Sequence, residues 1–421
     1  MDKLILQHSP PLRGTVAASG AKNAALPIMA ACLLTEEPVV LEGVPRVTDV
    51  LTMVDILRRL GIRVDHEDER LRIDPNHYTG STAPYELVSL MRASICVLGP
   101  LLARHHRARV SMPGGCILGP RPIDLHLKGL AALGAAIAVE HGDLVATTSG
   151  LRGTVIHLAG AFGSSVLATA NVMMAATLAQ GTTRIEHAAC EPEVVDLANF
   201  LIAMGATVSG QGTPVIQIDG VPELHGAHYR VIPDRIEVGT LLMATATLGG
   251  EVTVTGARGD HVGAVVETLR EANVQIEAGE GFLRVRSDRR LNAVEVTTLP
   301  FPGFPTDLQA QMMAMMSLSR GVSLMMEKIY PERFMHVPEL RRMGAQITHE
   351  GGSAIVKGVE QLSGAPVTAS DLRASAALVI AGLAAENTTE LRGVEHLDRG
   401  YERLEEKLAH LGASIRREHD A

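Results

Sequence analysis

Aromatic residues are scarce in this sequence, which has six Phe, five Tyr and no Trp among 421 residues. The core must therefore be built from Ala, Val, Leu and Ile and from 17 Met. Basic residues are also outnumbered: 38 Lys and Arg face 47 Asp and Glu, for a formal net charge of -9. Because a phosphate backbone demands a positive protein surface, this balance argues against general nucleic-acid binding. An anionic ligand would have to be met by a local cluster of basic side chains.

Long apolar runs are missing as well. The longest, residues 376–385, is far shorter than the roughly 20 residues that span a bilayer. The opening MDKLILQHSP has no long apolar core after its Lys, so it does not resemble a signal peptide. No CxxC pair is present, which argues against a structural zinc site or a disulfide framework. We therefore expect a cytoplasmic protein that does not contact a membrane. Its four cysteines are Cys32, Cys96, Cys116 and Cys190.

An internal repeat is the strongest sign of organisation in a chain that is long enough for two or three domains. Half of the repeated unit is a helix that stops at Gly and continues into a strand, as in ILRRLGIRV and FLIAMGATV. Gly adopts the left-handed backbone conformation without steric cost and Asn is its usual substitute, so we predict that conformation at every stop residue. The stop residues recur at intervals of 68 to 73 residues: Gly61, Gly134, Gly205, Asn273, Gly344 and Gly412.

The other half of the unit is a Gly-containing entry, an Ala-rich helix and a β-rich strand, as in VTASDLRASAALVIAGLAAENTTELRGV. Ala and Met on nearly all faces predict that these helices are buried all round, whereas the helices before the stop residues carry charge on one side and should lie at the surface. Six units could form one solenoid or two domains of three units. A solenoid should end in a polar repeat, but the last unit is as apolar inside as the others, which favours two closed domains.

Cys116 lies in the segment SMPGGCILGPRPIDLHLKGL, residues 111–130. The neighbouring Gly and Pro residues predict a loop, where a thiol is more exposed than on a strand. Arg121 could lower the pKa of the thiol and make it nucleophilic or proton-donating near neutral pH. The alternative is that Cys serves only as a small apolar residue. We adopt that interpretation for the other three cysteines and favour a functional role for Cys116.

Basic residues recur at the turns that enter the inner helices. Helix N-termini bind anions through free amides, and Arg grips carboxylate or phosphate with two hydrogen bonds. A surface ion pair is the alternative for any single Arg, but the set as a whole in an acidic chain predicts an anion site. Its members, with the neighbouring Asn, are Lys22, Asn23, Arg92, Arg121, Arg333, Arg373 and Arg399.

Asp307, in FPGFPTDLQAQMM, follows Pro305 and Thr306 and precedes an inner helix. Thr306 or Asp307 fits the role of a helix cap. Asp307 could also be a catalytic base if its carboxylate faces a ligand, and spacing alone does not separate the two. No G-x-x-x-x-G-K-[ST] or G-x-G-x-x-G motif is evident, and the 17 His are scattered, so we expect no nucleotide cofactor and no metal.

In order along the chain, SGAKNAALPI, PYELVSLMRASI, MPGGCILGPRPIDLH, EPEVVDLANFL, FPTDLQAQ, RFMHVPELRRMGA, DLRASAALV and HLDRGYERLEEKL resemble motifs of one family. That family is the UDP-N-acetylglucosamine 1-carboxyvinyltransferases, enolpyruvyl transferases of peptidoglycan precursor synthesis. The resemblance implies a two-domain inside-out α/β barrel with six βαβαββ-type units, three per domain. It implies an N-terminal domain of residues 22–231 and a C-terminal domain of residues 1–21 plus 232–421.

The resemblance also implies a reaction between two small molecules, phosphoenolpyruvate and UDP-N-acetylglucosamine, without cofactor, nucleic acid, membrane or obligate protein partner. Cys116 matches the family's loop cysteine, a general acid that also forms an adduct with phosphoenolpyruvate and is alkylated by fosfomycin. Lys22, Arg121 and Arg399 match the residues that hold the anionic groups of phosphoenolpyruvate, with Arg333 and Arg373 nearby.

For the nucleotide sugar, Asn23 and Asp307 match sugar contacts, and Asp307 matches the proposed base toward the 3-hydroxyl. The remaining matches are the uridine-binding residues Arg121, Pro122, Ile123, Asp124 and Leu125, the contact Ile329, the substrate-organising Arg92, and the backbone contacts Ser165 and Val166. Gly163 stands where the family has a basic residue, and Leu167 where it usually has Gly.

Two other functions remain as alternatives. The related shikimate-pathway enolpyruvyl transferase shares the architecture, but the MPGGC loop and the RPIDL segment argue against it. A catalytically silent repeat protein would need neither an anion pocket nor Cys116. Assays of phosphate release with each acceptor separate these alternatives.

Overall fold

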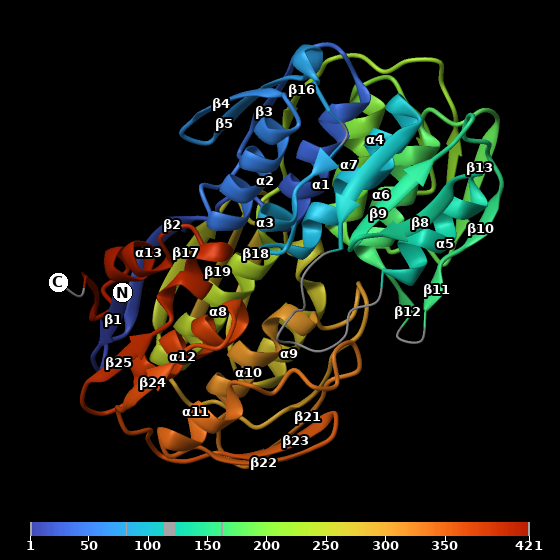
Figure 1. Ribbon diagram of the computed structural model, residues 1–421. Helices are drawn as coiled ribbons and strands as arrows, with labels where there is room; N and C mark the ends of the chain where they lie inside the picture. The colour runs from blue at the N-terminus through green and yellow to red at the C-terminus, as the bar shows by residue number, and fades with distance from the viewer. Residues whose placement is uncertain (1, 81, 113–122, 161–162, 420–421) are drawn as a thin grey trace. The chain divides into compact units, whose positions relative to one another are not determined.

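The computed structural model describes residues 2–80, 82–112, 123–160 and 163–419 (Figure 1). The chain divides into two compact units. The continuous unit is Gly20–Ile232, and the split unit combines the residues up to Ser19 with those from Pro233 onward. Each unit has its own hydrophobic core. Three sequence-predicted site residues, Cys116, Arg121 and Pro122, lie outside the described residues.

Among the described residues, each unit contains three four-stranded sheets, and all six sheets share one pattern. In each, an edge strand is parallel to its neighbour, and the remaining pairs are antiparallel. The sheets of the continuous unit, written across each sheet, are β16 (His228–Arg230), β3 (Val39–Glu42), β5 (Arg70–Asp74) and β4 (Arg63–Glu67); β6 (Thr82–Ala83), β7 (Arg107–Ser111), β9 (Asp143–Thr147) and β8 (Ala136–Glu140); and β10 (Val155–His157), β13 (Thr182–Glu186), β15 (Val215–Asp219) and β14 (Thr207–Ser209). A short antiparallel pair, β11 (Ala159–Gly160) and β12 (Gly163–Ser164), accompanies them.

The split unit draws strands from both ends of the chain. Its sheets are β2 (Leu12–Ala17), β17 (Gly250–Thr255), β19 (Phe282–Ser287) and β18 (Gln275–Gly279); β20 (Glu295–Thr297), β21 (Val322–Met326), β23 (Ser353–Lys357) and β22 (Gln346–Glu350); and β24 (Pro366–Thr368), β25 (Thr389–Arg392), β1 (Asp2–Leu6) and β26 (Ile415–His419). In the last of these sheets Leu4 lies between Leu391 and Arg417. Figure 1 shows the blue β1 beside the red β25. The first strands of the chain therefore complete sheets built from its second half.

Buried and exposed side chains alternate along the strands, so that one face of each strand meets the core. In β5, Leu71 and Ile73 are buried while Arg70 and Arg72 are exposed, which is the period of two expected for a sheet with one solvated face. The same pattern occurs in β19, where Leu283 and Val285 are buried. Each sheet thus turns one apolar face toward the helices of its unit.

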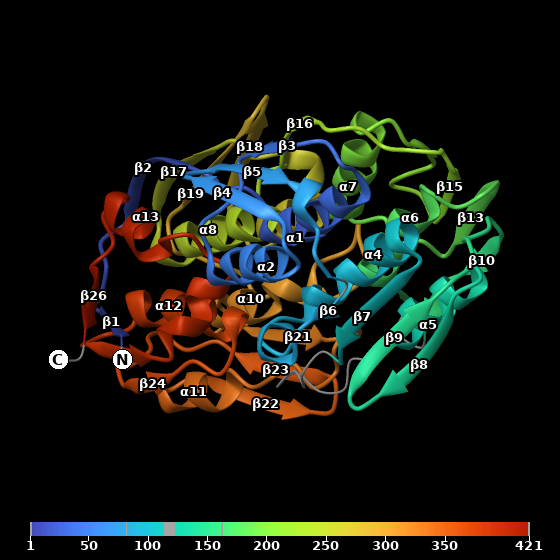
Figure 2. The same cartoon turned by 45° about the horizontal axis from the view of Figure 1, so that its top comes forward.

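The Ala- and Met-rich helices are buried, as the sequence predicts. In α6, nine of eleven residues are buried, and in α8 thirteen of fourteen. Small side chains on every face let such helices pack closely, and α8, α10 and α12 contact one another (Figure 2). These inner helices are α1 (Lys22–Ala31), α4 (Leu98–His105) and α6 (Val166–Ala176) in the continuous unit, and α8 (Arg235–Leu248), α10 (Gln309–Met316) and α12 (Leu372–Ala384) in the split unit.

The charged helices end at the predicted stop residues, all six of which have positive φ, from 71° at Asn273 to 103° at Gly205. The predicted left-handed conformation is confirmed. These helices are α2 (Thr48–Arg59), α5 (Asp124–Ala132), α7 (Pro192–Ala203), α9 (Gly263–Glu271), α11 (Val337–Arg342) and α13 (Leu404–His410). The shorter helical segments are α3 (Tyr85–Val88), η1 (Cys32–Leu34), η2 (Pro75–His77), η3 (Arg92–Val97), η4 (Gly259–His261), η5 (Thr306–Leu308) and η6 (Val394–Arg399). Within the described ranges, no helix has the length and apolar character that crossing a membrane requires.

Candidate active site

Asp307 lies between two buried arginines in the split unit. Its Oδ1 accepts a hydrogen bond from Arg333 Nη1, and its Oδ2 accepts one from Arg373 Nη2, both at 2.7 Å. The two arginine side chains are only 6% and 3% exposed, whereas a quarter of the Asp307 side chain remains exposed. The carboxylate is therefore the member of this cluster that solvent or a ligand can reach. These arginines are not surface ion pairs, which was the alternative for each.

Three elements position the cluster. Asp307 is in η5, immediately before α10, and Arg373 is in the first turn of α12. Asp371 caps α12, since its Oδ1 accepts hydrogen bonds from the backbone amides of Arg373 and Ala374 at 2.8 and 3.1 Å. The cap predicted for Thr306 or Asp307 is wrong: neither side chain caps η5 or α10. The carboxylate of Asp307 is instead occupied by the two guanidinium groups.

The charge balance of the cluster fixes the protonation of Asp307. Burial alone would raise its pKa, but the charges of Arg373 and Arg333 outweigh burial, so the pKa of Asp307 lies well below its usual value. Burial would likewise lower the pKa of Arg373, yet the charge of Asp307 keeps that pKa above its usual value. Asp307 is therefore ionised throughout the neutral range and can accept a proton, although its low pKa makes it a weak base.

Several buried donors around Asp307 lack a hydrogen-bond partner in the described part of the chain. They are Nε and Nη1 of Arg373 and Nε of Arg333. Buried polar groups are nearly always satisfied, and leaving one unpaired costs about 1–3 kcal/mol, more if it is charged. The three side chains together carry an excess of positive charge, which stabilises the ionised Asp307 carboxylate.

A network of neighbouring polar side chains supports the cluster. Gln311 Nε2 donates to the backbone oxygen of Asp307 at 3.0 Å, to the hydroxyl oxygen of Tyr401 at 3.0 Å and to that of Thr240 at 3.3 Å. The guanidinium of Arg373 lies over the Tyr401 ring, 5.4 Å from its centroid. These contacts hold Asp307 and Arg373 to the inner helices α8 and α10.

Two other predicted residues of the split unit follow these elements. Ile329 donates its backbone N–H to Glu327 Oε1 at 2.8 Å. Arg399 is the last residue of η6, which packs against α12, the helix that carries Arg373. The structure thus brings Asp307, Arg333 and Arg373 into direct contact, and it connects Ile329 and Arg399 to the same part of the unit through neighbouring elements.

In the continuous unit, Lys22 begins α1 and is buried together with Asp49 of α2. Lys22 Nζ lies 2.9 Å from Asp49 Oδ2, and their side chains are 10% and 6% exposed. Asn23 follows Lys22 in the first turn, and no side chain caps the helix. A helix start without a side-chain cap favours an anion or water at its first amides.

The remaining predicted residues of this unit begin helical segments too. Arg92 is the first residue of η3, and Asp124 and Leu125 open α5, preceded by the buried Ile123. Burial lowers the pKa of His126 to about 3, with the charge of Arg92 contributing, so this histidine is neutral. The N-terminal ends of helices favour anionic groups, including the carboxylate of Asp124 itself.

Ser165 and Val166 begin α6, where the Ser165 hydroxyl accepts a hydrogen bond from the backbone amide of Ala168 at 3.3 Å. Gly163, at the family's basic position, has φ of 94°. L-amino acids with a side chain rarely adopt that conformation. A Gly here is therefore explained by the backbone, and a basic residue would be strained.

The other cysteines behave as small apolar residues. Cys32 and Cys96 are buried, and burial raises the pKa of both thiols, that of Cys96 to about 12. Burial and the charge of Glu191 raise the pKa of Cys190. These pKa shifts suppress the reactive thiolate, in agreement with the expectation from the sequence.

Sequence reasoning missed the partners of the predicted residues: Asp49, Asp371, Gln311 and Glu327. Only Asp371 had a local signal, because an Asp directly before an Ala-rich helix is a typical N-cap. Glu327 follows the apolar strand VSLMM, and a carboxylate at the end of a buried strand could have been noticed. Asp49 and Gln311 act through contacts distant in sequence.

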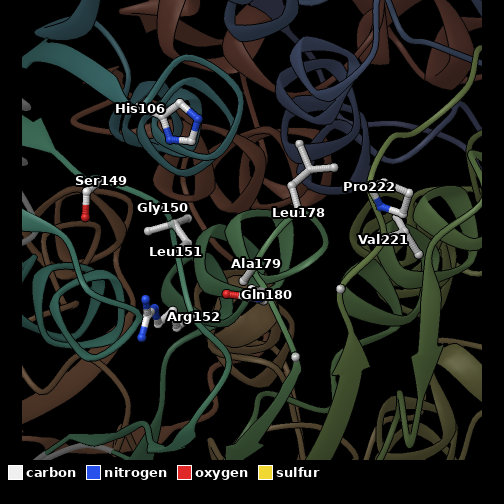
Figure 3. A pocket seen from close by; sticks show the side chains of 12 residues that line it. His106, Ser149, Gly150, Leu151, Arg152, Leu178, Ala179, Gln180, Val221 and Pro222 are labelled. Atoms are coloured by element: carbon white, nitrogen blue, oxygen red, sulfur yellow. The ribbon is translucent and has the colours of Figure 1, made fainter.

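A hollow of about 430 Å³ lies elsewhere in the continuous unit (Figure 3). His106, Ser149, Arg152 and Gln180 line it, and none of the sequence-predicted residues does. It lies beyond the C-terminal end of α6, whose eleven residues span about 16 Å from the end that Ser165 caps. Because helix C-termini carry partial negative charge, this end of the unit is the less suited to an anion.

Repeated sheets around buried helices, with a carboxylate held by two buried arginines, define a two-unit α/β protein. Comparison with known proteins makes this assignment specific. The sequence profile of "EPSP synthase (3-phosphoshikimate 1-carboxyvinyltransferase)" matches residues 6–408. The chain belongs to this family of enolpyruvyl transferases, as the sequence motifs indicated.

Relatives within the family are similar over the full length. The UDP-N-acetylglucosamine 1-carboxyvinyltransferase of Methylacidiphilum infernorum is 53% identical, with 99% of each chain covered. That of Thermodesulfovibrio yellowstonii is 50% identical, with 99% of this chain and 100% of the relative covered. Among solved structures, the enolpyruvyl transferase NikO from Streptomyces tendae has a TM-score of 0.89 at 25% identity, covering 99% of this chain and 98% of that chain. EPSP synthase from Acinetobacter baumannii, at 17% identity and a TM-score of 0.76 over 99% and 100% of the two chains, shares the fold.

Proposed function

We propose that this enzyme transfers the enolpyruvyl group of phosphoenolpyruvate to the 3-hydroxyl of UDP-N-acetylglucosamine and releases phosphate. The observation that carries the proposal is the identity of 50–53% with four full-length relatives that are named UDP-N-acetylglucosamine 1-carboxyvinyltransferase. The buried arginines around Asp307 support it, because both substrates are anionic. The reaction would be the first committed step of peptidoglycan precursor synthesis, in the cytoplasm.

We propose an addition followed by an elimination. The sugar 3-oxygen bonds to C2 of phosphoenolpyruvate while C3 gains a proton, giving a tetrahedral intermediate. Loss of a proton from C3 then expels phosphate and restores the double bond. In this scheme Cys116 delivers the proton to C3, and Asp307 takes the proton of the sugar hydroxyl. Because Asp307 is a weak base, its proton transfer has to accompany formation of the C–O bond, so that no free alkoxide forms.

The cationic residues would bind and stabilise the departing phosphate and the carboxylate. We assign Lys22, Arg121 and Arg399 to the anionic groups of phosphoenolpyruvate, with Arg333 and Arg373 beside them. The two buried arginines beside the single carboxylate of Asp307 provide an excess of positive charge, which supports a role in binding an anion. No organic cofactor or metal takes part in this scheme.

We assign the nucleotide sugar to a second set of residues. Most of its described members lie at helix starts, which favours contacts with the diphosphate and the sugar hydroxyls, whereas Ile329 follows β21. The set comprises Asn23, Arg92, Arg121, Pro122, Ile123, Asp124, Leu125, Ser165, Val166, Asp307 and Ile329.

We also propose the finer architecture of the family, an inside-out α/β barrel of six units in domains 22–231 and 1–21 plus 232–421. The common strand order of the six sheets supports the repeat. The division of the chain after Ser19 and after Ile232 supports these domains to within two residues.

The test is an assay of phosphate release with phosphoenolpyruvate and each of two acceptors. We expect turnover with UDP-N-acetylglucosamine and none with 3-phosphoshikimate. The second acceptor is included because the family profile carries the name of the shikimate enzyme. Turnover with 3-phosphoshikimate alone would overturn the proposal, and turnover with neither would favour a silent protein.

A further inference from the structure

We infer that Glu327, a residue outside the set predicted from sequence, positions both the catalytic base and the nucleotide-sugar contact Ile329. This inference rests on the proposed function. Glu327 directly follows β21 and is 2% exposed, so it can touch neither solvent nor substrate. Its role has to be exercised through its neighbours.

The carboxylate of Glu327 accepts four hydrogen bonds. Oε1 accepts from the hydroxyl of Thr298 at 2.7 Å and from the backbone amides of Ile329 and Tyr330 at 2.8 and 2.9 Å. Oε2 accepts from the hydroxyl of Thr306 at 2.9 Å. One side chain thus fixes both the backbone at Ile329 and the residue that precedes the catalytic base.

Thr306 extends this arrangement to the base. Its single hydroxyl proton goes to Glu327, which leaves the oxygen free to accept a hydrogen bond from Arg333 Nη1 at 3.0 Å. The same Nη1 donates to Asp307 Oδ1 at 2.7 Å. Glu327 therefore sets the direction of the Thr306 hydroxyl, and that hydroxyl helps to hold the arginine that orients Asp307.

The chemistry of the site requires a carboxylate. Four donors converge on residue 327, and an ionised carboxylate can accept all four because it has no proton of its own. A glutamine would keep one acceptor oxygen but would turn an NH2 group toward at least one of the donors. If that donor is the Thr306 hydroxyl, the hydroxyl has to reverse and its contact with Arg333 is disturbed.

Positioning makes a different prediction from general structural support. Loss of the contact should affect the acceptor sugar and the proton transfer more than the affinity for phosphoenolpyruvate, because Arg333 keeps its hydrogen bond to Asp307. We expect Glu327→Gln and Thr306→Val to lower kcat about 10- to 100-fold, the range for a misplaced catalytic group. The KM for UDP-N-acetylglucosamine should rise at least about fivefold, and that for phosphoenolpyruvate less than about twofold, since one lost hydrogen bond is worth roughly tenfold.

The experiment measures both KM values and kcat for the full-length wild type, Glu327→Gln, Thr306→Val and two further variants. Thr306→Ser restores the hydroxyl and should recover kcat to within about threefold of the wild type, as loss of one methyl group warrants. Thr298→Val is the matched control for kcat, because its hydroxyl donates to the same carboxylate and accepts a hydrogen bond from the backbone amide of Lys328 at 3.0 Å, on the side that leads to Ile329 and not to Asp307. Its kcat should stay within about threefold of the wild type, whereas its KM for UDP-N-acetylglucosamine should rise, since one lost hydrogen bond is worth roughly tenfold.

The outcomes separate the inference from the function on which it rests. If the wild type makes no product, the proposed function itself is wrong. An active wild type with Thr306→Val unchanged, or with Thr306→Ser as impaired as Thr306→Val, overturns the positioning role. Equal losses of kcat in Thr298→Val and Thr306→Val would overturn it too, because they would mean that Glu327 only supports the fold around it. If Glu327→Gln fails to fold, the two Thr306 variants decide alone.

Discussion

In the split unit one carboxylate, Asp307, lies between two buried arginines, whereas in the continuous unit the ammonium group of Lys22 faces the carboxylate of Asp49. The first arrangement has more cationic than anionic charge and leaves guanidinium donors unused. In the second, the Lys22 ammonium lies 2.9 Å from the Asp49 carboxylate, so an anion that approaches Lys22 has to compete with Asp49. The proposed mechanism adds a division of roles, with the acid Cys116 in the continuous unit and the base Asp307 in the split unit.

The largest effect is expected when the proposed acid, Cys116, is blocked by alkylation. Fosfomycin should inactivate the wild type completely, because the Cys116 thiolate attacks the epoxide carbon, the ring opens and the thioether is permanent. Cys116→Asp should retain turnover, since a carboxyl group can also donate a proton, and should resist the drug. The measurement is residual activity together with the mass of the intact protein. Cys190→Ser is the matched control and should remain sensitive to the drug. Resistance of this variant would show that Cys190, and not Cys116, is the thiol that reacts.

Removal of the base tests the other side of the comparison. Asp307→Asn keeps the shape of the side chain but cannot accept a proton, so kcat should fall by about 10³-fold, within the range for general base catalysis. Asp288→Asn, an exposed carboxylate of the same unit, should leave kcat unchanged. Steady-state kinetics of both variants provide the measurement. Asp307→Asn with more than a tenth of wild-type kcat would mean that another group takes the proton.

Asp49→Asn sharpens the contrast between the two units. The change removes the charge that orients Lys22 but keeps the side-chain shape, so the KM for phosphoenolpyruvate should rise about tenfold, the value of one charge-assisted hydrogen bond. The KM for the nucleotide sugar should stay within about twofold, a change smaller than one hydrogen bond. Asp55→Asn on the same helix α2 is the control, because its ion pair with Arg58 is more than half exposed. A lower KM for phosphoenolpyruvate in Asp49→Asn would show that Asp49 only competes for Lys22.

The smallest expected effect concerns stability against pH. The folded-state pKa of Asp307 is depressed, so its contribution to stability is present above the unfolded pKa of about 3.9 and is lost as the pH falls toward the folded value. Wild type and Asp307→Asn should therefore differ by a constant free energy of unfolding between about pH 6 and pH 9, and the difference should shrink below about pH 4. Urea unfolding at several pH values measures it. A difference that changes between pH 6 and pH 9 would mean that Asp307 is not ionised there.

Local sequence signals predicted the parts of the fold that depend on neighbouring residues. The stop residues could be found because a left-handed backbone restricts the residue type, and the Asn at position 273 has the same conformation as the five Gly. The inner helices could be found because Ala and Met on every face fit only a buried position. The pairing of β1 with β25 and β26 leaves no local pattern, because it joins the two ends of the chain, and only the family resemblance assigned residues 1–21 to the C-terminal domain.

The candidate site likewise contains residues that the sequence could predict and residues that it could not. Asp307, Arg333 and Arg373 could be proposed from motif resemblance, but their mutual contact depends on where η5 and α12 meet. Glu327 was missed because its function is to accept hydrogen bonds from backbone amides and hydroxyls, which every sequence offers. The role of Gly163 became apparent only from its φ angle.

The insertion of β1 between β25 and β26 has a consequence for biosynthesis. The first strand has to wait for residues 389–419 before its sheet can close. At roughly 5–20 residues per second, translation of this chain takes about 20–80 s. During that time an apolar segment containing Leu4 and Leu6 stays without its native partners, which leaves it open to association with other apolar segments.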